Sequence, residues 1–337
     1  VLRGDKMKNK ANWLLPAICF AIFLLMILKA DLVIAGAYAG IEICLYTVFP
    51  SLFPFIFLSS LLTDATAGLS IPFLKPLGRL CGIPAGSESI FLAGILGGYP
   101  AGAQAVAQQH KAGHISSQQA NHLLRFCNNA GPAFIFGIIG SILKDIRLAF
   151  IIWIIHTLSA IITGWLFANS TNTGKIKIKP SSLDVVSTLH RTVKTMAKIC
   201  GWVILFRMLI SIFDYYVLEH LPANIGTIIC GILELSNGCI RLKNMDIAYI
   251  FVASSLLLSF GGICVWMQTA SIIKPLNLQH FCLGKCVQSV ISVLICFILS
   301  PILFDCSYYI AIIGCVLLSA YIGVMKKSSS ILKLSRV

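Results

Sequence analysis

Helix-breaking and polar residues interrupt two apolar stretches in the first half of this 337-residue chain. The first interruption reads GGYPAGAQ at 97–104, and the second reads NNAGPAFIFG at 128–137. Two counterparts follow in the second half, ELSNG at 234–238 and SFGGICVWMQ at 259–268. Glycine and proline break the hydrogen-bond ladder of a helix, and unpaired backbone persists inside a bilayer only where protein or a watery cavity satisfies it. Broken apolar segments at matching positions of two halves therefore predict a transport site near the middle of a membrane.

The GGYPAGAQ break offers a place for an anionic group. Gly98, Tyr99 and Pro100 stop one helix, and the helix that restarts after the proline presents free N–H groups at its positive end. Gln104 lies one turn further along and adds amide donors and acceptors. Alternatively, Gly98 and Gly102 form a GxxxG pair that only lets two helices pack closely. We favour the binding site, because GxxxG alone does not explain the proline and the glutamine.

The NNAGPAFIFG break repeats the same device. Asn128 and Asn129 supply capping or ligand amides, and Gly131 and Pro132 begin a new apolar helix. Paired asparagines in front of a buried helix are costly unless their amides are satisfied. The alternative is an ordinary helix cap at the membrane surface.

Glu234 follows a fully apolar run and precedes Asn237, which predicts a carboxylate inside the membrane. Such a residue indicates a functional site by default, and we expect it to pair with Arg207, Arg241 or the asparagine pair, or to carry a coupling proton. Alternatively, it marks only the end of a helix at the interface.

The last break contains Gly262, and Gln268 lies about two turns beyond it. This segment should complete the site from the second half of the chain.

Composition shows what must position these residues. Hydrophobic residues make up 58% of the chain and charged residues 11%, with a mean hydropathy of +0.90. A soluble domain of this length could not cover so much apolar surface. We expect an all-α, polytopic integral membrane protein with eight to ten membrane helical elements, some broken or re-entrant, in two pseudo-symmetric halves. The apolar run 32–62 is too long for one straight helix, so Pro50 and Pro54 should kink or split it.

The chain divides at its polar and basic segments. The expected regions are a tail and first transmembrane helix (1–30), a first half (31–168), a basic linker with an amphipathic helix (169–198), a second half (199–325) and a basic tail (326–337). Lys and Arg cluster at both ends and in the linker, which predicts that all three face the cytoplasm. The net charge of +14 is thus explained by topology and does not indicate nucleic-acid binding.

Signatures of catalysis are missing from the sequence. It has no GxSxG, no HExxH, no P-loop and no dinucleotide-binding glycine motif. The 13 cysteines are scattered without a CxxC pair, so we expect no metal site and no cofactor. We therefore expect a protein that is not an enzyme and whose transport is secondary or passive.

GGYPAGAQ, FCNNAGPAFIFGIIG and the late FGGICVWMQ together resemble the sporulation integral membrane protein YlbJ family. That family is related to the wider nucleoside-recognition, or Gate-domain, membrane proteins. The similarity runs from about Tyr46 to Leu303 and is weaker in the second half, where the bulky Trp266 follows the glycine pair. Carried over by motif, it implies these substrate-binding positions: Gly98, Tyr99, Pro100, Gly102, Gln104, Asn128, Asn129, Gly131, Pro132, Glu234, Asn237, Gly262 and Gln268.

The resemblance implies a transporter in the mother-cell or outer forespore membrane of an endospore-forming bacterium. Its expected solute is a small aromatic dianion, dipicolinate, exported from the mother cell toward the forespore. The partners would be that anion, the lipid bilayer and a coupling proton or sodium ion, with a homo-oligomer as a further option. Two alternatives stay open: a nucleoside or nucleobase transporter, whose planar ligand would fit the same amides, and a membrane scaffold for sporulation that transports nothing.

Overall fold

The computed structural model describes residues 2–66, 69–168, 184–305 and 307–334. All regular structure within these residues is helical. Among the described residues, six helical segments are long and apolar enough to cross a membrane: Ala30–Ala65, Ile146–Leu166, Val185–Tyr216, Ile247–Ile273, Leu278–Phe304 and Tyr309–Lys326. Four shorter apolar helices cover Pro16–Leu28, Glu88–Gly97, Pro132–Leu143 and Ala223–Leu233. The expected fold class, an all-α polytopic membrane protein, is confirmed.

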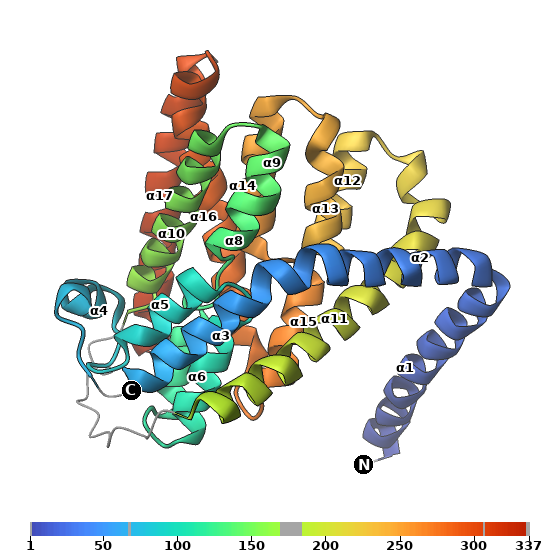
Figure 1. The fold of residues 1–337 in the computed structure, drawn as a ribbon, viewed down its shortest axis with the longest axis horizontal. Coiled ribbons are helices and arrows are strands. Elements are labelled where there is room, and N and C mark those ends of the chain that lie inside the picture. Colours follow the sequence, from blue (N-terminus) through green and yellow to red (C-terminus); the bar gives the residue numbers. More distant parts are fainter. Residues whose placement is uncertain (1, 67–68, 169–183, 306, 335–337) are drawn as a thin grey trace.

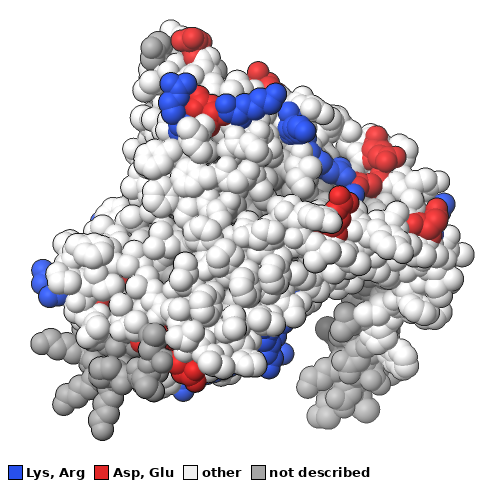
Figure 2. Space-filling model, in the orientation of Figure 1, with Lys and Arg blue, Asp and Glu red and all other residues white. Residues whose placement is uncertain are grey.

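The surface fits that assignment. Charged side chains gather along the upper edge in Figure 2, and a broad band without charge lies below them. Large apolar side chains such as Tyr46, Phe150 and Val316 are exposed, as expected of a surface that faces lipid.

The first half of the chain contains two long spans with broken elements between them. It begins with α1 (Leu2–Leu28), α2 (Ala30–Ile43), the π-helical turn η1 (Cys44–Val48) and α3 (Phe49–Ala65). After η2 (Pro72–Leu74) and α4 (Lys75–Cys81), α5 (Glu88–Gly97) and α6 (Ala101–Lys111) pack against each other as a first hairpin. The first broken helix then consists of α7 (Ser117–Leu124), α8 (Pro132–Phe134), the π-helical turn η3 (Ile135–Ile139) and α9 (Gly140–Leu143), and the span α10 (Ile146–Leu166) follows.

The second half repeats this order. The span α11 (Val185–Tyr216) and η5 (Leu218–His220) precede a second hairpin, formed by α12 (Ala223–Leu233) and α13 (Leu235–Arg241). After η6 (Leu242–Asn244), the second broken helix consists of α14 (Ile247–Phe260) and α15 (Gly262–Ile273), and it leads to the span α16 (Leu278–Phe304). A last helix, α17 (Tyr308–Leu334), packs on α16 and α10.

The two halves are inverted relative to each other. In Figure 1 the first hairpin lies in the lower part of the molecule and the second hairpin in the upper part. The connection from α9 to α10 lies at the upper end, whereas the corresponding connection from α15 to α16 lies at the lower end. Inverted repeats of this kind are a common architecture of secondary transporters. The start of α1 and the end of α17 both point toward the lower side.

Two expected features can be compared with the structure. The run 32–62 bends between α2 and α3, as a kink requires (Figure 1), but it is not split into separate helices. The π-helical turn Cys44–Val48 lies just before Phe49 and Pro50 and accommodates the carbonyl group that lacks an N–H partner because of the proline. The amphipathic helix expected to end at 198 instead continues without interruption to Tyr216, because neither proline nor a helix-ending turn separates the two segments. Residues 169–183 of the expected linker lie outside the described residues.

Candidate functional site

The first hairpin turns at the GGYP sequence and is packed tightly against the first broken helix. Gly98 adopts φ +76°, a conformation that favours glycine. A methyl group at Gly94 or Gly102 would lie 1.7 or 1.8 Å from the carbonyl oxygen of Cys127. Gly102 is therefore needed for close packing, as the alternative reading of the GxxxG pair expected. Pro100 caps α6, and the amide oxygen of Gln104 accepts a hydrogen bond from the Thr195 hydroxyl at 3.1 Å.

The asparagine pair is fully buried at the break of the first broken helix. The Asn128 side chain accepts a hydrogen bond from the Ala103 amide at 3.2 Å, near the start of α6, and donates one to Thr269 at 3.2 Å. Asn129 donates to the Phe126 carbonyl at 2.7 Å. Both side chains thus tie the break to its neighbours, and part of the positive end of α6 is already satisfied by the chain itself.

At the tip of the second hairpin, Glu234 is buried with an exposure of 2% and caps α13. Its carboxylate accepts hydrogen bonds from the Ser236 amide at 3.1 Å, the Asn237 amide at 2.8 Å and the Asn237 side chain at 2.6 Å. The expected pairing with Arg207, Arg241 or the asparagine pair is wrong, because both arginines pair with Asp214 and the side chains of Asn128 and Asn129 bond to other groups. The positive end of α13 therefore already holds an anion, the Glu234 carboxylate.

Three of the breaks and the helix that follows the fourth converge on one small cavity of about 40 Å³. Residues from the breaks and from α15 line it: Tyr99, Ala130, Gly131, Glu234, Ser236 and Gln268. Apolar residues of η1, α3 and α11 close it: Val48, Leu52, Ile199 and Val203. The volume suits one or two water molecules and is too small for an aromatic solute.

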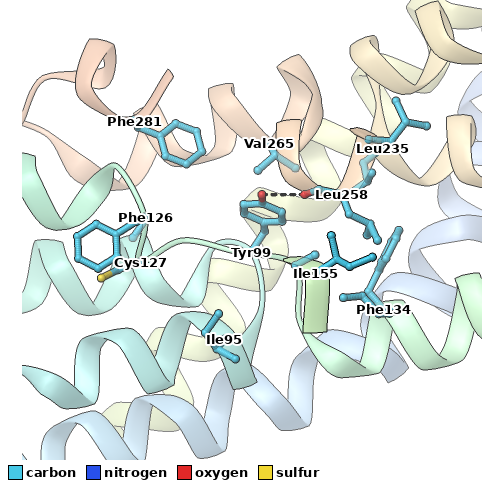
Figure 3. Close-up of a cluster of buried hydrophobic side chains, with 14 of the residues drawn as sticks. Ile95, Tyr99, Phe126, Cys127, Phe134, Ile155, Leu235, Leu258, Val265 and Phe281 are labelled. Atoms are coloured by element: carbon cyan, nitrogen blue, oxygen red, sulfur yellow. Dashed lines mark hydrogen bonds between the residues drawn. The ribbon is translucent and has the colours of Figure 1, made fainter. Parts of the chain in front are cut away.

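Close backbone contacts hold the breaks around this cavity. A methyl group at Gly131 would lie 2.9 Å from the Gly98 Cα atom, which bars any side chain there. Pro132 opens α8 directly behind Gly131. In the second half, a methyl group at Gly262 would lie 3.0 Å from the Gly231 carbonyl oxygen. The Tyr99 hydroxyl donates a hydrogen bond to the Leu258 carbonyl at 3.0 Å and so joins the first hairpin to the second broken helix (Figure 3).

Among the thirteen expected site residues, four line the cavity and the others support it. Tyr99, Gly131, Glu234 and Gln268 face the cavity. The remaining nine shape or anchor the breaks: Gly98, Pro100, Gly102, Gln104, Asn128, Asn129, Pro132, Asn237 and Gly262.

Lys285 was missed by the sequence analysis, although it lies next to these breaks. It is fully buried in α16, and its ammonium group donates hydrogen bonds to the Asn128 carbonyl at 2.7 Å and the Asn129 side chain at 3.1 Å. The signal was present, because a lysine inside the apolar segment FCLGKCVQSV is as unusual in a membrane span as Glu234.

A buried histidine completes the polar centre. The Ala130 amide donates a hydrogen bond to Nε2 of His156 at 3.0 Å, so that nitrogen carries no proton. The proton of a neutral ring must then lie on Nδ1, which is 3.1 Å from the Ser259 hydroxyl. His156 is therefore held neutral and links the first broken helix to the second. No cluster of three or more His, Cys, Asp or Glu side chains suited to a metal ion occurs among the described residues.

Comparison with known proteins gives one informative relative. No family model matches the chain, and no solved structure matches it. The sporulation integral membrane protein YlbJ of Bacillus subtilis (strain 168) is 24% identical to this chain, over 74% of the chain and 73% of the relative. The relationship to the nucleoside-recognition group remains a prediction. The chain is thus an integral membrane protein similar to YlbJ over most of its length.

Proposed function

We propose that the protein is a secondary transporter for a small anionic aromatic solute. The observation that carries this proposal is the convergence of two hairpin tips and two broken helices on one cavity. In transporters with inverted repeats, substrate sites lie where broken helices meet near the middle of the bilayer. A scaffold protein would gain nothing from burying Glu234, Lys285 and the asparagine pair at such a point, where buried polar groups are costly.

The 40 Å³ cavity represents a closed conformation of this transporter. A planar dicarboxylate needs several times that volume, so the hairpins must separate from α3 and α11 to admit it. The apolar walls of the cavity suit an aromatic ring, while the Gln268 amide and the Ser236 hydroxyl suit its carboxylates.

Glu234 would couple binding of the anion to uptake of a proton. An ionised carboxylate at the cavity wall would repel a second carboxylate, since like charges in a poorly solvated site disfavour each other. We therefore assign the coupling-ion role to a proton that Glu234 takes up when the solute binds. The expected neutral variant, Glu234→Gln, should still bind the solute but should lose coupled transport.

The specific solute we propose is dipicolinate, moved from the mother cell toward the forespore across the membrane that encloses it. Support comes from the name of the relative, which places that protein in sporulation, and from the chemistry of the cavity. We propose the same membrane for this chain, with both ends and the linker on the cytoplasmic side. The alternative is a nucleoside or nucleobase, which is favoured by one observation: Glu234 lines the cavity, and a carboxylate there would accept hydrogen bonds from the N–H groups of a neutral base.

Uptake by vesicles that contain the purified protein tests these proposals. Labelled dipicolinate and labelled uridine are offered separately, with and without a proton gradient. Dipicolinate uptake that requires the gradient supports the anion transporter, and uridine uptake alone supports the nucleoside alternative. A protein that moves neither solute, although it is folded and correctly inserted, contradicts both.

A further inference from the structure

The Lys285 ammonium group lies in a cage of four oxygen atoms. It donates to the Asn128 backbone carbonyl at 2.7 Å, the Asn129 side-chain oxygen at 3.1 Å, the Tyr99 hydroxyl at 3.2 Å and the side-chain oxygen of Gln288. The cage lies where the first hairpin, the first broken helix and α16 meet. Four acceptors surround three N–H groups, so the charge is fully coordinated.

The orientation of the three side-chain oxygens is imposed by a second hydrogen bond of each side chain, and the fourth oxygen is a backbone carbonyl. The Asn129 amide nitrogen donates to the Phe126 carbonyl at 2.7 Å, which turns its oxygen toward the lysine. The Gln288 nitrogen donates to the His156 carbonyl at 3.2 Å, and the Tyr99 hydroxyl proton is used by the Leu258 carbonyl. Because a backbone carbonyl only accepts hydrogen bonds, the amide nitrogens of Asn129 and Gln288 must face these carbonyls and their oxygens must face the lysine. The cage is thus built to present oxygen to a cation.

No carboxylate takes part in this coordination. The ion pairs of the described residues join arginines to Asp64, Asp145 and Asp214, and none includes Lys285. A lone ammonium in a dry interior is costly. Neutral carbonyl and amide oxygens that replace the hydration shell of an ion are the chemistry of sodium and potassium sites in channels and transporters.

We propose that this cage is a monovalent-cation site occupied by the side chain of Lys285, so that the protein requires no sodium or potassium ion there. The tethered ammonium group holds the first hairpin, the asparagine break and α16 in register, as a bound ion would. The proposal concerns the cage alone and does not depend on the identity of the transported solute.

Chemical rescue tests this assignment. Lys285→Ala removes the ammonium group and leaves space for a small ion beside the four oxygens. The unfolding midpoint of the variant in detergent is measured at constant ionic strength in ammonium, potassium, sodium or choline chloride. Ammonium and potassium ions are similar in size and should raise the midpoint by several degrees over choline, which is too large to enter; sodium should raise it less. The unchanged protein should show the same midpoint in all four salts.

Two control variants separate the cage from general effects of salt. Ser292→Ala removes another buried polar group of α16, outside the cage, and should respond equally to all four salts. Lys285→Met fills the volume of the lysine stem with an apolar chain. Its unfolding midpoint should therefore not rise in ammonium or potassium over choline, unlike that of Lys285→Ala. A Lys285→Ala protein with one midpoint in all salts, or one that cannot be obtained folded in any of them, overturns the proposal. A marked sodium dependence of the unchanged protein overturns it as well.

Discussion

Glu234 both caps a helix and faces the cavity, so its two roles can be separated by substitution. Glu234→Ala removes the acceptor for two backbone amides and should lower the free energy of unfolding by about 1 kcal/mol. Glu234→Gln keeps an acceptor oxygen and should leave the fold intact, while coupled uptake is lost. Thermal unfolding and vesicle uptake measure the two effects.

Asp246 provides the matched control for this pair of variants. It caps α14 through the Ala248 and Tyr249 amides, in the same way as Glu234, but at an exposed position away from the cavity. Asp246→Asn should therefore leave uptake unchanged. Full uptake with the original pH dependence in Glu234→Gln would remove Glu234 from the transport mechanism.

At the residue scale, the sequence predicted that Glu234 is buried, but it did not predict which groups donate hydrogen bonds to its carboxylate. An arginine partner was expected because a buried carboxylate needs donors, yet the nearest donors are the amides of its own helix. The position of Lys285 could be suspected from its apolar neighbours. Gln288 lies one turn away on the same helix, but the other three oxygen partners come from segments up to 186 residues away in the chain and could not be found without the fold.

At the element scale, the contact between Gly98 and Gly131 should be essential and a neighbouring glycine dispensable. Gly131→Val would place a branched side chain against the Gly98 backbone, where even a methyl group comes within 2.9 Å of the Cα atom. We expect a loss of roughly 1–3 kcal/mol in stability together with a loss of uptake. Gly137→Val, in the same broken helix, is the control, because nothing lies within 4 Å of that position.

Equal effects of the two valine substitutions would show that the helix, not the contact between the breaks, limits function. The basic residues of the linker offer a further comparison: Lys175→Gln and Lys177→Gln, in the segment outside the described residues, should reduce uptake less than Gly131→Val.

The sequence located all four breaks, because glycine, proline and asparagine act locally on the helix ladder. It could not predict that α5 and α6 form a hairpin, because two short apolar helices have the same sequence pattern whether they cross the membrane or turn back within it. The glycines that permit close packing, Gly94 and Gly231, meet partners in other segments and have no local signal. Local chemistry was therefore predictable and the partners of each break were not.

At the scale of the whole molecule, two aspartates at corresponding places in the inverted halves each bind the second helix of one hairpin, α6 or α13. Asp64, near the end of α3, accepts hydrogen bonds from Gln108 of α6 and from Arg191. Asp214, near the end of α11, accepts one from Arg241 of α13. Alternating access in the proposed transporter requires release of one hairpin at a time, so each aspartate should secure only its own hairpin.

Hydrogen exchange measured by mass spectrometry tests this arrangement. Asp64→Asn should speed exchange in 101–111 and leave 235–241 unchanged, whereas Asp214→Asn should do the reverse. Asparagine keeps an acceptor oxygen but loses the charge, so the hydrogen bond is weakened; a weakening of about 1 kcal/mol corresponds to roughly fivefold faster exchange if opening of the hairpin determines the rate. Asp145→Asn disrupts an exposed ion pair with Arg147 at the start of α10 and should alter neither hairpin. Faster exchange in both hairpins from either aspartate variant would mean that the halves open together, which contradicts alternating release.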